Sequence, residues 1–110
     1  MRDVIVIGGA VMGASVAYWL TKFSPNLRVS VIERDTTYAR ASTALSVASV
    51  RQQFTNPVNV EISRFGVQFI RDFGQELGLE RGAGDLGLKE NGYLFLAGSQ
   101  DAADVMAEVA

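Results

Sequence analysis

Residues 4–13 are Val-Ile-Val-Ile-Gly-Gly-Ala-Val-Met-Gly, and this stretch decides the fold. Its first four residues are β-branched without polar alternation, which is typical of a strand buried on both faces of a parallel sheet. From Val11 to Phe23 the apolar residues recur at helical spacing, so the glycines mark the turn from a strand into a helix. Ser24-Pro25-Asn26 ends that helix, and residues 28–33 predict a second strand. The first third of the chain therefore predicts strand, turn, helix and strand.

The glycine turn fits the dinucleotide-binding fingerprint except at its middle position, where Ala10 replaces a glycine. Gly8 lets the chain leave the strand sharply, position 10 lies where backbone approaches a pyrophosphate, and Gly13 lets the helix pack close to the sheet. The N–H groups at the start of the helix then face the phosphates, with the positive end of the helix dipole behind them. The candidate cofactor-binding residues of this turn are Gly8, Gly9, Ala10, Val11, Met12 and Gly13.

Glu33 ends the second predicted strand, about 20 residues after the last glycine of the turn, where an acidic residue is expected in this fingerprint. A carboxylate there accepts hydrogen bonds from the ribose hydroxyls of the adenosine and repels a 2′-phosphate. Arg34 is a second candidate, because an arginine beside the acid favours a 2′-phosphate instead. The alternative interpretation of Glu33 is an ordinary solvated acid at a strand end.

Beyond the second strand the pattern changes. Residues 34–55 predict a long loop, and Asn56-Pro57 supplies a cap and a first helical residue for the next helix. The following apolar stripe predicts a core face on one helix that ends at Gly78; its members are Ile62, Phe65, Phe69, Phe73 and Leu77. Residues 79–91 predict an irregular segment, residues 92–97 a strand, and a helix begins near Ser99. That last helix has no stop signal, so we expect the chain to end within an element.

The composition excludes several function classes. The chain has 110 residues, a net charge of −2, no cysteine and no histidine, so disulfides, thiolate chemistry and the usual zinc ligand sets are excluded. The basic residues are spread without a cluster, which argues against a nucleic-acid partner. Residues 4–20 carry no charge, but their glycines argue against a membrane span or a signal sequence. A cytoplasmic location is the default expectation.

Four segments together resemble a known family. They are Val-Ile-Gly-Gly-Ala-Val-Met-Gly-Ala-Ser-Val-Ala-Tyr-Trp-Leu at 6–20, Val-Ile-Glu-Arg-Asp at 31–35, Ala-Ser-Thr-Ala-Leu-Ser-Val-Ala-Ser-Val-Arg-Gln-Gln-Phe at 41–54 and Gly-Tyr-Leu-Phe-Leu-Ala at 92–97. The chain resembles the D-amino-acid oxidase superfamily of FAD-dependent oxidoreductases, most closely its sarcosine and dimethylglycine oxidising branch. The resemblance covers nearly the whole chain but only the opening part of such an enzyme. The cofactor that it implies is FAD.

The resemblance also implies roles for individual residues. Ser42 and Thr43 would lie by the FAD pyrophosphate, and the stretch containing Ala48, Ser49, Arg51 and Gln52 would pass along the flavin ring. Arg51 is the candidate catalytic residue, because a cation near the ring stabilises the negative charge of the reduced flavin. The alternative is a surface arginine whose stem packs on Phe54. Family members often attach flavin through cysteine or histidine, which this sequence lacks.

The predicted fold class is α/β: a Rossmann-like FAD/NAD(P)-binding βαβ unit with its flavin-contacting loop and helix (residues 1–78), then the start of a substrate-binding α+β domain (residues 79–110). The resemblance implies the N-terminal FAD-binding portion of an oxidoreductase that acts on an amine or amino acid. A fragment of an NAD-dependent dehydrogenase and a non-catalytic nucleotide-binding subunit are the alternatives. We expect the isolated chain to self-associate or to bind partner subunits, because one edge of its first strand lacks a partner.

Overall fold

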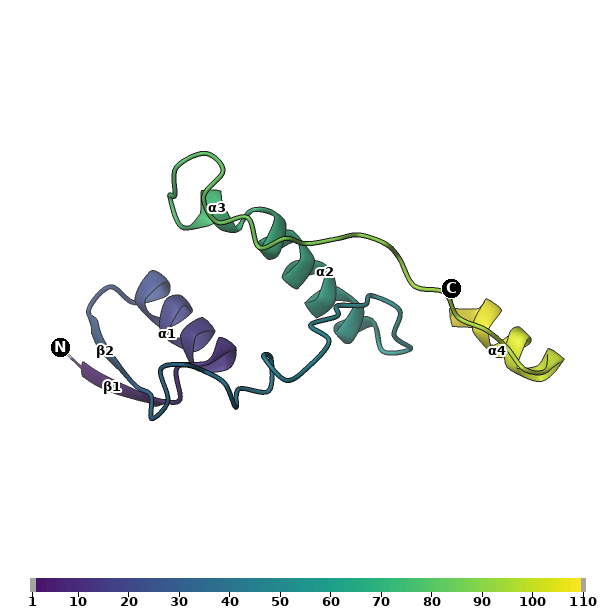
Figure 1. Cartoon of the computed structure of the whole chain (residues 1–110), viewed down its shortest axis with the longest axis horizontal. Helices are drawn as coiled ribbons and strands as arrows, with labels where there is room; N and C mark the ends of the chain where they lie inside the picture. The colour runs from purple at the N-terminus through teal and green to yellow at the C-terminus, as the bar shows by residue number, and fades with distance from the viewer. Residues whose placement is uncertain (1, 110) are drawn as a thin grey trace. The chain divides into compact units, whose positions relative to one another are not determined.

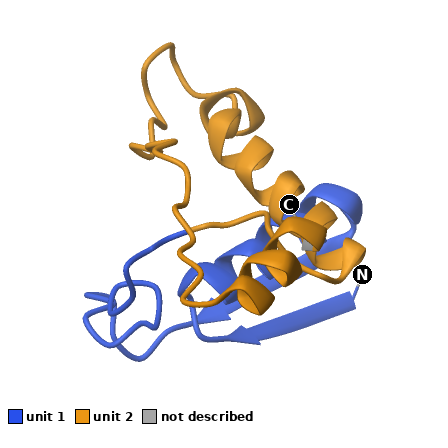
Figure 2. Ribbon diagram, turned by 90° about the vertical axis from the view of Figure 1, so that its right-hand side faces the viewer, with its two compact units in different colours: residues 1–49 blue, residues 50–110 orange. Residues whose placement is uncertain are grey.

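The computed structural model describes residues 2–109, which form two compact units that divide between Ser49 and Val50 (Figures 1 and 2). The first unit contains β1 (Arg2–Ile7), α1 (Val11–Phe23) and β2 (Leu27–Ile32). The second contains α2 (Pro57–Arg71), α3 (Phe73–Glu76) and α4 (Gln100–Val109). The predicted domain boundary after residue 78 differs from this division into compact units and stays a prediction.

The first unit is the predicted βαβ arrangement. Strands β1 and β2 pair in parallel, with Arg2 opposite Leu27 and Ile7 opposite Ile32, and α1 contacts both strands from one face (Figure 1). The early βαβ prediction is therefore confirmed as a mixed α/β unit with a parallel two-stranded sheet. This parallel pairing brings the carboxyl ends of β1 and β2 to the same edge of the sheet, which is the edge where such folds bind ligands.

A pair of charged side chains fixes the opposite ends of the two strands. The Arg28 guanidinium donates to both carboxylate oxygens of Asp3, with Nε–Oδ1 and Nη2–Oδ2 distances of 2.6 and 2.9 Å. The hydrogen bond from Arg28 holds the pKa of Asp3 below its usual range. Asp3 lies opposite Arg28 in the ladder, and because both side chains are well exposed this ion pair contributes little to the stability of the fold.

The segment between β2 and α2 is a loop, as the sequence predicts. It consists of successive turns, in which Tyr38 and Ala48 adopt left-handed backbone with φ of 55° and 48°. One helical turn forms where the Leu45 N–H donates to the Ala41 carbonyl at 3.1 Å. Hydrogen bonds within the loop therefore maintain the conformation of residues 35–48.

Helix α2 begins as predicted, with the Asn56 side chain accepting a hydrogen bond from the Val58 N–H at 3.0 Å and Pro57 in the first turn. The single helix expected as far as residue 77 is wrong, because Asp72 leaves helical geometry at ψ 5° and separates α2 from α3. The predicted stop at Gly78 is confirmed. Gly78 has φ of +64°, and the N–H groups of Gly78 and Leu79 donate to the carbonyls of Gln75 and Gly74 at 3.0 and 2.8 Å.

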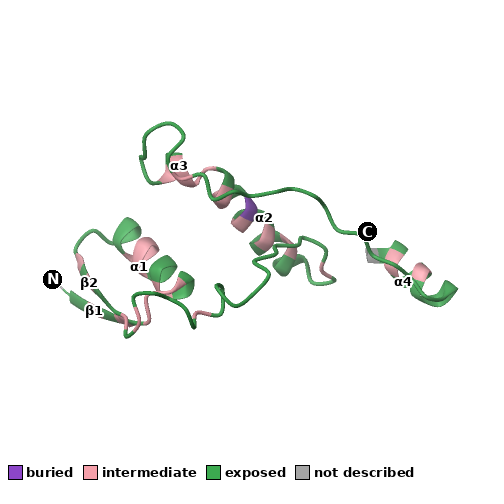
Figure 3. Cartoon of the chain, viewed as in Figure 1, coloured by how far each residue is buried: buried purple, intermediate pink, exposed green. Residues whose placement is uncertain are grey.

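The apolar stripe that begins in α2 was expected to be a core face; Phe69 and Phe73 are half-buried, and the other members are exposed. Ile62 is 63% exposed and Phe65 is 58% exposed, whereas Val67, at 6%, is the one residue between 2 and 108 that is buried (Figure 3). A helix face is buried only when a second layer covers it, and within the second unit α2 contacts α3. Within the second unit the stripe is therefore covered only in part.

Residues 92–97 do not form the predicted strand. Their backbone has no ladder partner, because the sheet in the described part of the chain consists of β1 and β2. The rings of Tyr93 and Phe95 stack with centroids 6.0 Å apart, so alternate side chains share a side, as they would on a strand. The segment thus keeps the side-chain alternation of a strand, but a strand also needs a neighbouring backbone to which it can hydrogen-bond. The helix expected near Ser99 is confirmed as α4, whose Ala102 N–H donates to the Ser99 hydroxyl at 3.3 Å.

The charge-free residues 4–20 are divided between β1, the glycine turn and α1, as their glycines indicate. Within residues 2–109, no helix has the length and apolar character that crossing a bilayer requires. The cytoplasmic location stays a prediction.

Candidate functional site

Gly8 turns the chain out of β1. Its φ of +96° lies in a region that favours glycine, and its N–H donates to the Ile32 carbonyl at 2.8 Å. A Cβ at this position would meet no atom within 4 Å, so the backbone conformation and not the available space requires glycine here. The hydrogen bond to Ile32 ties the turn to the end of β2.

Gly13 allows α1 to lie directly against that turn. A Cβ on Gly13 would collide with the Gly8 carbonyl oxygen and would lie 3.2 Å from the Val6 Cγ1 atom. Any side chain would therefore push the helix away from the turn and from β1. The predicted reason for a glycine at position 13, a close helix-to-strand approach, agrees with this geometry.

Gly9 joins the glycine turn to the acid at the end of β2. Its N–H donates to the Glu33 Oε2 atom at 2.7 Å. A Cβ on Gly9 would lie 3.1 Å from the Tyr38 hydroxyl oxygen and 3.3 Å from the Glu33 Cβ. Glycine at position 9 therefore leaves room for the side chains of Tyr38 and Glu33 beside the turn.

The N-terminus of α1 presents backbone donors. Ala10 precedes the helix in extended conformation (φ −65°, ψ −177°), and its side chain caps nothing. The N–H groups of Val11, Met12 and Gly13 belong to the first turn, where an α-helix has no internal acceptors. Such donors, together with the helix dipole, form a site for an anion such as a phosphate.

The Glu33 carboxylate is held by two backbone N–H groups. Besides the bond from Gly9, its Oε1 atom accepts from the Asp35 N–H at 2.9 Å. The hydrogen bonds from Gly9 and then Asp35 hold the pKa of Glu33 below its usual range, so the group is charged at neutral pH. Each carboxylate oxygen has a further lone pair, which leaves acceptor capacity for a ligand hydroxyl.

These parts surround one hollow within the first unit, which we call the nucleotide cleft. It has a volume of about 870 Å³ and lies at the carboxyl ends of β1 and β2. Pockets for small molecules and cofactors commonly have volumes of roughly 300–1,000 Å³. The lining residues of the nucleotide cleft are Ile7, Gly8, Ala10, Ile32, Glu33, Arg34, Asp35, Tyr38, Arg40 and Ala41.

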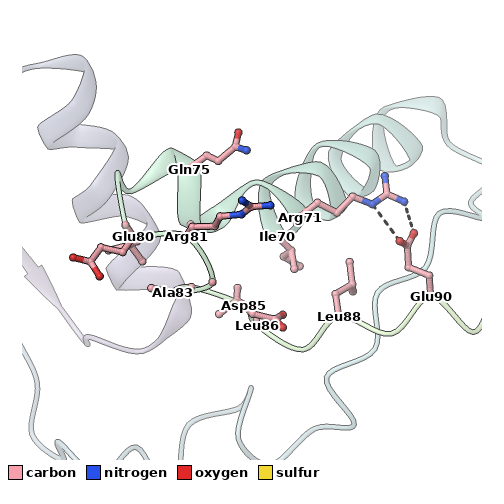
Figure 4. A pocket seen from close by; sticks show the side chains of 14 residues that line it. Ile70, Arg71, Gln75, Glu80, Arg81, Ala83, Asp85, Leu86, Leu88 and Glu90 are labelled. Carbon is pink, nitrogen blue, oxygen red and sulfur yellow. Dashed lines mark hydrogen bonds and ion pairs between the residues drawn. The ribbon is translucent and has the colours of Figure 1, made fainter.

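A second hollow, of about 400 Å³, lies within the second unit (Figure 4). Arg71 donates to Glu90 across its rim, and this hydrogen bond raises the pKa of Arg71. A Cβ on Gly74 would lie 2.5 Å from the Ala83 carbonyl oxygen, so the walls here are a glycine-rich loop folded back onto α3. We assign the functional site to the nucleotide cleft, because only that hollow combines a helix N-terminus with an oriented carboxylate. The residues that line the second hollow are Ile70, Arg71, Gly74, Gln75, Leu79, Glu80, Arg81, Gly82, Ala83, Gly84, Asp85, Leu86, Leu88 and Glu90.

The structure brings together part of the predicted site. Gly8, Ala10, Glu33 and Arg34 line the nucleotide cleft, and Gly9 bonds to one of its walls. The remaining turn residues predicted for the site, Val11, Met12 and Gly13, lie in the first turn of α1, next to the lining residue Ala10. Ser42 and Thr43 follow the lining residue Ala41 in a turn, where the Thr43 carbonyl accepts from the Ser46 hydroxyl at 3.0 Å. Their role at a pyrophosphate stays a prediction.

The predicted flavin-contacting residues divide between the two units. Ala48 adopts φ of 48° and Ser49 follows it in the first unit, whereas Arg51 and Gln52 are exposed residues of the second. The Arg51 guanidinium lies over the Phe54 ring, with its Cζ atom 4.7 Å from the ring centroid. The alternative interpretation, a surface arginine packed on Phe54, involves the same two residues. The role of Arg51 at the flavin stays a prediction.

Six lining residues of the cleft were not predicted from the sequence as site residues, and the three of them with polar side chains are Asp35, Tyr38 and Arg40. The Asp35-Thr36-Thr37 sequence carried a usable signal, because an aspartate often accepts from the backbone two residues later. The Thr37 N–H does donate to the Asp35 Oδ1 atom at 3.0 Å. This turn directs the loop back across the end of β2.

Comparison with known proteins agrees with a FAD site. The FAD dependent oxidoreductase family named DAO matches residues 3–110. The chain is 46% identical over 110 residues to FAD-dependent oxidoreductase domain-containing protein 1 of Xenopus laevis, covering 96% of this chain and 22% of that protein. The Bos taurus protein of the same name is 47% identical over 105 residues, covering 92% of this chain and 22% of the relative. A Drosophila melanogaster homologue is 40% identical over 105 residues, covering 91% and 19%.

The chain thus spans about a fifth of the length of these curated relatives. No solved structure matches it. The family match displaces the nicotinamide alternative, because the matching family is defined by FAD. The glycine turn, the donors of α1 and the oriented Glu33 carboxylate also fit the ADP half of that cofactor. The chain therefore belongs to the DAO family of FAD-dependent oxidoreductases, and its cofactor is FAD.

Proposed function

We propose that this chain is the N-terminal FAD-binding portion of an oxidoreductase that oxidises an amine or amino acid. The observation that carries the proposal is the hydrogen bond of 2.7 Å from the Gly9 N–H to the Glu33 carboxylate. It fixes an acceptor beside the phosphate-binding turn, at the carboxyl end of β2. An acceptor in that position suits the ribose of a dinucleotide whose pyrophosphate lies at the start of α1.

In this proposal, different groups of the cleft bind different parts of the ADP half of FAD. The first-turn N–H groups of α1 bind the pyrophosphate, and Glu33 accepts from the ribose hydroxyls. Because Glu33 is charged and already oriented, it disfavours a ribose that carries a phosphate. The methyl group of Ala10 lies on the cleft wall and narrows the pyrophosphate path without adding a charge.

The proposed substrate class rests on the resemblance of residues 41–54 and 92–97 to sarcosine and dimethylglycine oxidising enzymes. When bound, the flavin accepts a hydride equivalent from the carbon beside the amine, and the resulting imine is hydrolysed by water. Arg51 is proposed to stabilise the negative charge that the reaction places on the cofactor. The catalytic unit in this proposal is the full-length protein, meaning the polypeptide of the relatives' length that contains this chain.

An anaerobic substrate screen tests the proposal. Purified full-length protein is expected to show the visible absorbance of bound flavin, and that absorbance is expected to bleach on addition of an amine substrate. The panel contains sarcosine, dimethylglycine and unmethylated amino acids. Each is paired with the hydroxy acid of the same carbon skeleton as a matched control that lacks the nitrogen.

Bleaching by an amine but not by its paired hydroxy acid supports C–N oxidation. A protein that binds flavin and is bleached only by hydroxy acids would contradict the amine assignment while leaving the FAD site intact. A full-length protein that binds no flavin at all would contradict the proposal as a whole.

A further inference from the structure

We propose that Tyr38 is a further cofactor-contacting residue, whose ring forms the wall of the nucleotide cleft against which the adenine of FAD stacks. This inference rests on the proposed function, because it assigns a role within the same FAD site. The observation behind it is a placement: Tyr38 lies in the loop after β2, yet it lines the cleft together with Gly8 and Glu33.

The packing of Tyr38 orients its ring. Its hydroxyl oxygen lies 3.1 Å from the position of a Cβ on Gly9, so the end of the side chain rests on the glycine turn. The residue is nevertheless 40% exposed and lines the cleft, so it is accessible to a ligand there. Of the lining residues in the described chain, Tyr38 is the one with an aromatic ring. A flat ring beside a ribose-binding carboxylate suits the flat adenine base.

The backbone holds Tyr38 in this position against its own preference. Its φ of 55° is left-handed, which is unusual for a bulky residue and costs free energy that the surroundings must offset. Two hydrogen bonds maintain it: the Tyr38 N–H donates to the Asp35 carbonyl at 3.0 Å, and its carbonyl accepts from the Ala41 N–H at 2.9 Å. Strained residues of this kind concentrate at ligand-binding sites.

The same network orients Glu33. Asp35 donates from its N–H to Glu33 and accepts from Thr37 through its carboxylate, so one turn positions both the acid and the aromatic ring. Arg34 and Arg40 also line the cleft, and a guanidinium plane can stack on a base, so the assignment to Tyr38 rests on the placement of its side chain against the glycine turn. The geometry therefore gives Tyr38 the stacking role at the adenosine end.

Binding measurements on variants of the full-length protein test this inference. Tyr38→Asn removes the ring but tolerates left-handed backbone, and Tyr38→Gly does the same with still less strain. Both variants are expected to weaken FAD and ADP binding by the same factor, roughly tenfold or more, which is the scale of losing one base–aromatic stack. Tyr38→Phe keeps the ring and is expected to bind both ligands as the wild type does.

Two controls accompany these variants. Flavin mononucleotide, which has the flavin but no adenosine, is expected to bind all of them equally. Tyr93→Asn makes the same substitution at a residue of similar exposure, 44%, outside the nucleotide cleft, and is expected to leave ADP affinity unchanged. Isothermal titration calorimetry on apoprotein gives each dissociation constant without reference to turnover.

The outcomes separate the two proposals. If wild-type protein binds FAD and ADP, and Tyr38→Asn and Tyr38→Gly bind ADP equally tightly, the role of Tyr38 is overturned and the FAD site stands. An equal loss of flavin mononucleotide affinity would also overturn it, because the contact would not be with the adenosine. If the wild type binds neither FAD nor ADP, the proposed function itself fails.

Discussion

Substituting Gly13 by alanine should destabilise the protein, although the same change inside a helix usually stabilises it. Gly13 lies in the first turn of α1, directly above the Gly8 carbonyl. Gly66 lies within α2, and a Cβ added there would meet nothing within 4 Å. Gly66→Ala is therefore a matched control, because the chemical change is identical and only the surroundings differ.

The magnitude follows from two opposing effects. Alanine is favoured over glycine in a helix by about 1 kcal/mol, and this gain applies in full to Gly66→Ala. At Gly13 the new methyl collides with the Gly8 carbonyl oxygen and lies 2.9 Å from the carbonyl carbon, both of which are backbone atoms. Overpacking of this kind costs about 1–3 kcal/mol, so the steric term exceeds the helix gain at position 13. Because the helix gain is common to both variants, they should differ by the steric cost, about 1–3 kcal/mol in free energy of unfolding.

Urea denaturation of the full-length protein, followed by circular dichroism, measures this difference through the transition midpoints. Flavin absorbance retained after gel filtration reports the cleft separately, and we expect Gly13→Ala to lose FAD while Gly66→Ala keeps it. A Gly13→Ala protein as stable as Gly66→Ala, with its flavin retained, would refute the close approach of α1 to the glycine turn.

Three further predictions concern the same site, and a fourth concerns the isolated chain. Glu33→Ala should weaken FAD binding by roughly 10- to 150-fold, the scale for hydrogen bonds to a charged group, and fluorescence titration measures the loss. Because the pKa of Glu33 in the folded protein is lowered, the contribution of Glu33 to FAD affinity should be fully present at neutral pH. It should disappear only as the pH falls through that lowered pKa, and an FAD affinity that already falls near neutral pH would contradict this. Ala10→Val should obstruct the pyrophosphate whereas Ala10→Gly is tolerated, and normal FAD binding by the valine variant would remove the turn from the phosphate site. The 110-residue chain alone should be inactive. It should also self-associate, because Ile5 and Ile7 of β1 are exposed, and size-exclusion chromatography with light scattering measures this. A monodisperse monomer that retains FAD and oxidises an amine would overturn both expectations.

The first unit could be predicted from the sequence because its signals are local. The β-branched run, the glycines and the helical spacing that begins at Val11 are all contained in one short stretch, and each element lies within two residues of its expected bounds. The strand expected at residues 92–97 failed because pairing depends on a second backbone, which no local pattern supplies. The break at Asp72 was missed for a related reason, since the apolar spacing continues across it.

The same distinction between local and non-local signals separates the site residues that the sequence predicted from those that it did not. Gly8, Gly13 and Glu33 were found from their spacing, because each satisfies a backbone requirement that fixes its residue type. Tyr38 was missed because a left-handed tyrosine has no sequence signature, and only the turn around it shows where its ring lies. The roles of Ser42 and Arg51 came from family resemblance, so neither follows from the physical chemistry of its own neighbours.

The short spacing between the paired strands has a consequence for the order of assembly during protein synthesis. The Asp3–Arg28 contact joins residues 25 apart, and every lining residue of the nucleotide cleft precedes Thr43. Closing so short a loop costs little chain entropy, and a ribosome adds roughly 5–20 residues per second. We therefore expect the parts of the cleft to be available within seconds of the synthesis of residues 3–41. Cofactor capture can then begin on the nascent chain, where a bound ADP half would favour the βαβ arrangement while the later elements are still being made.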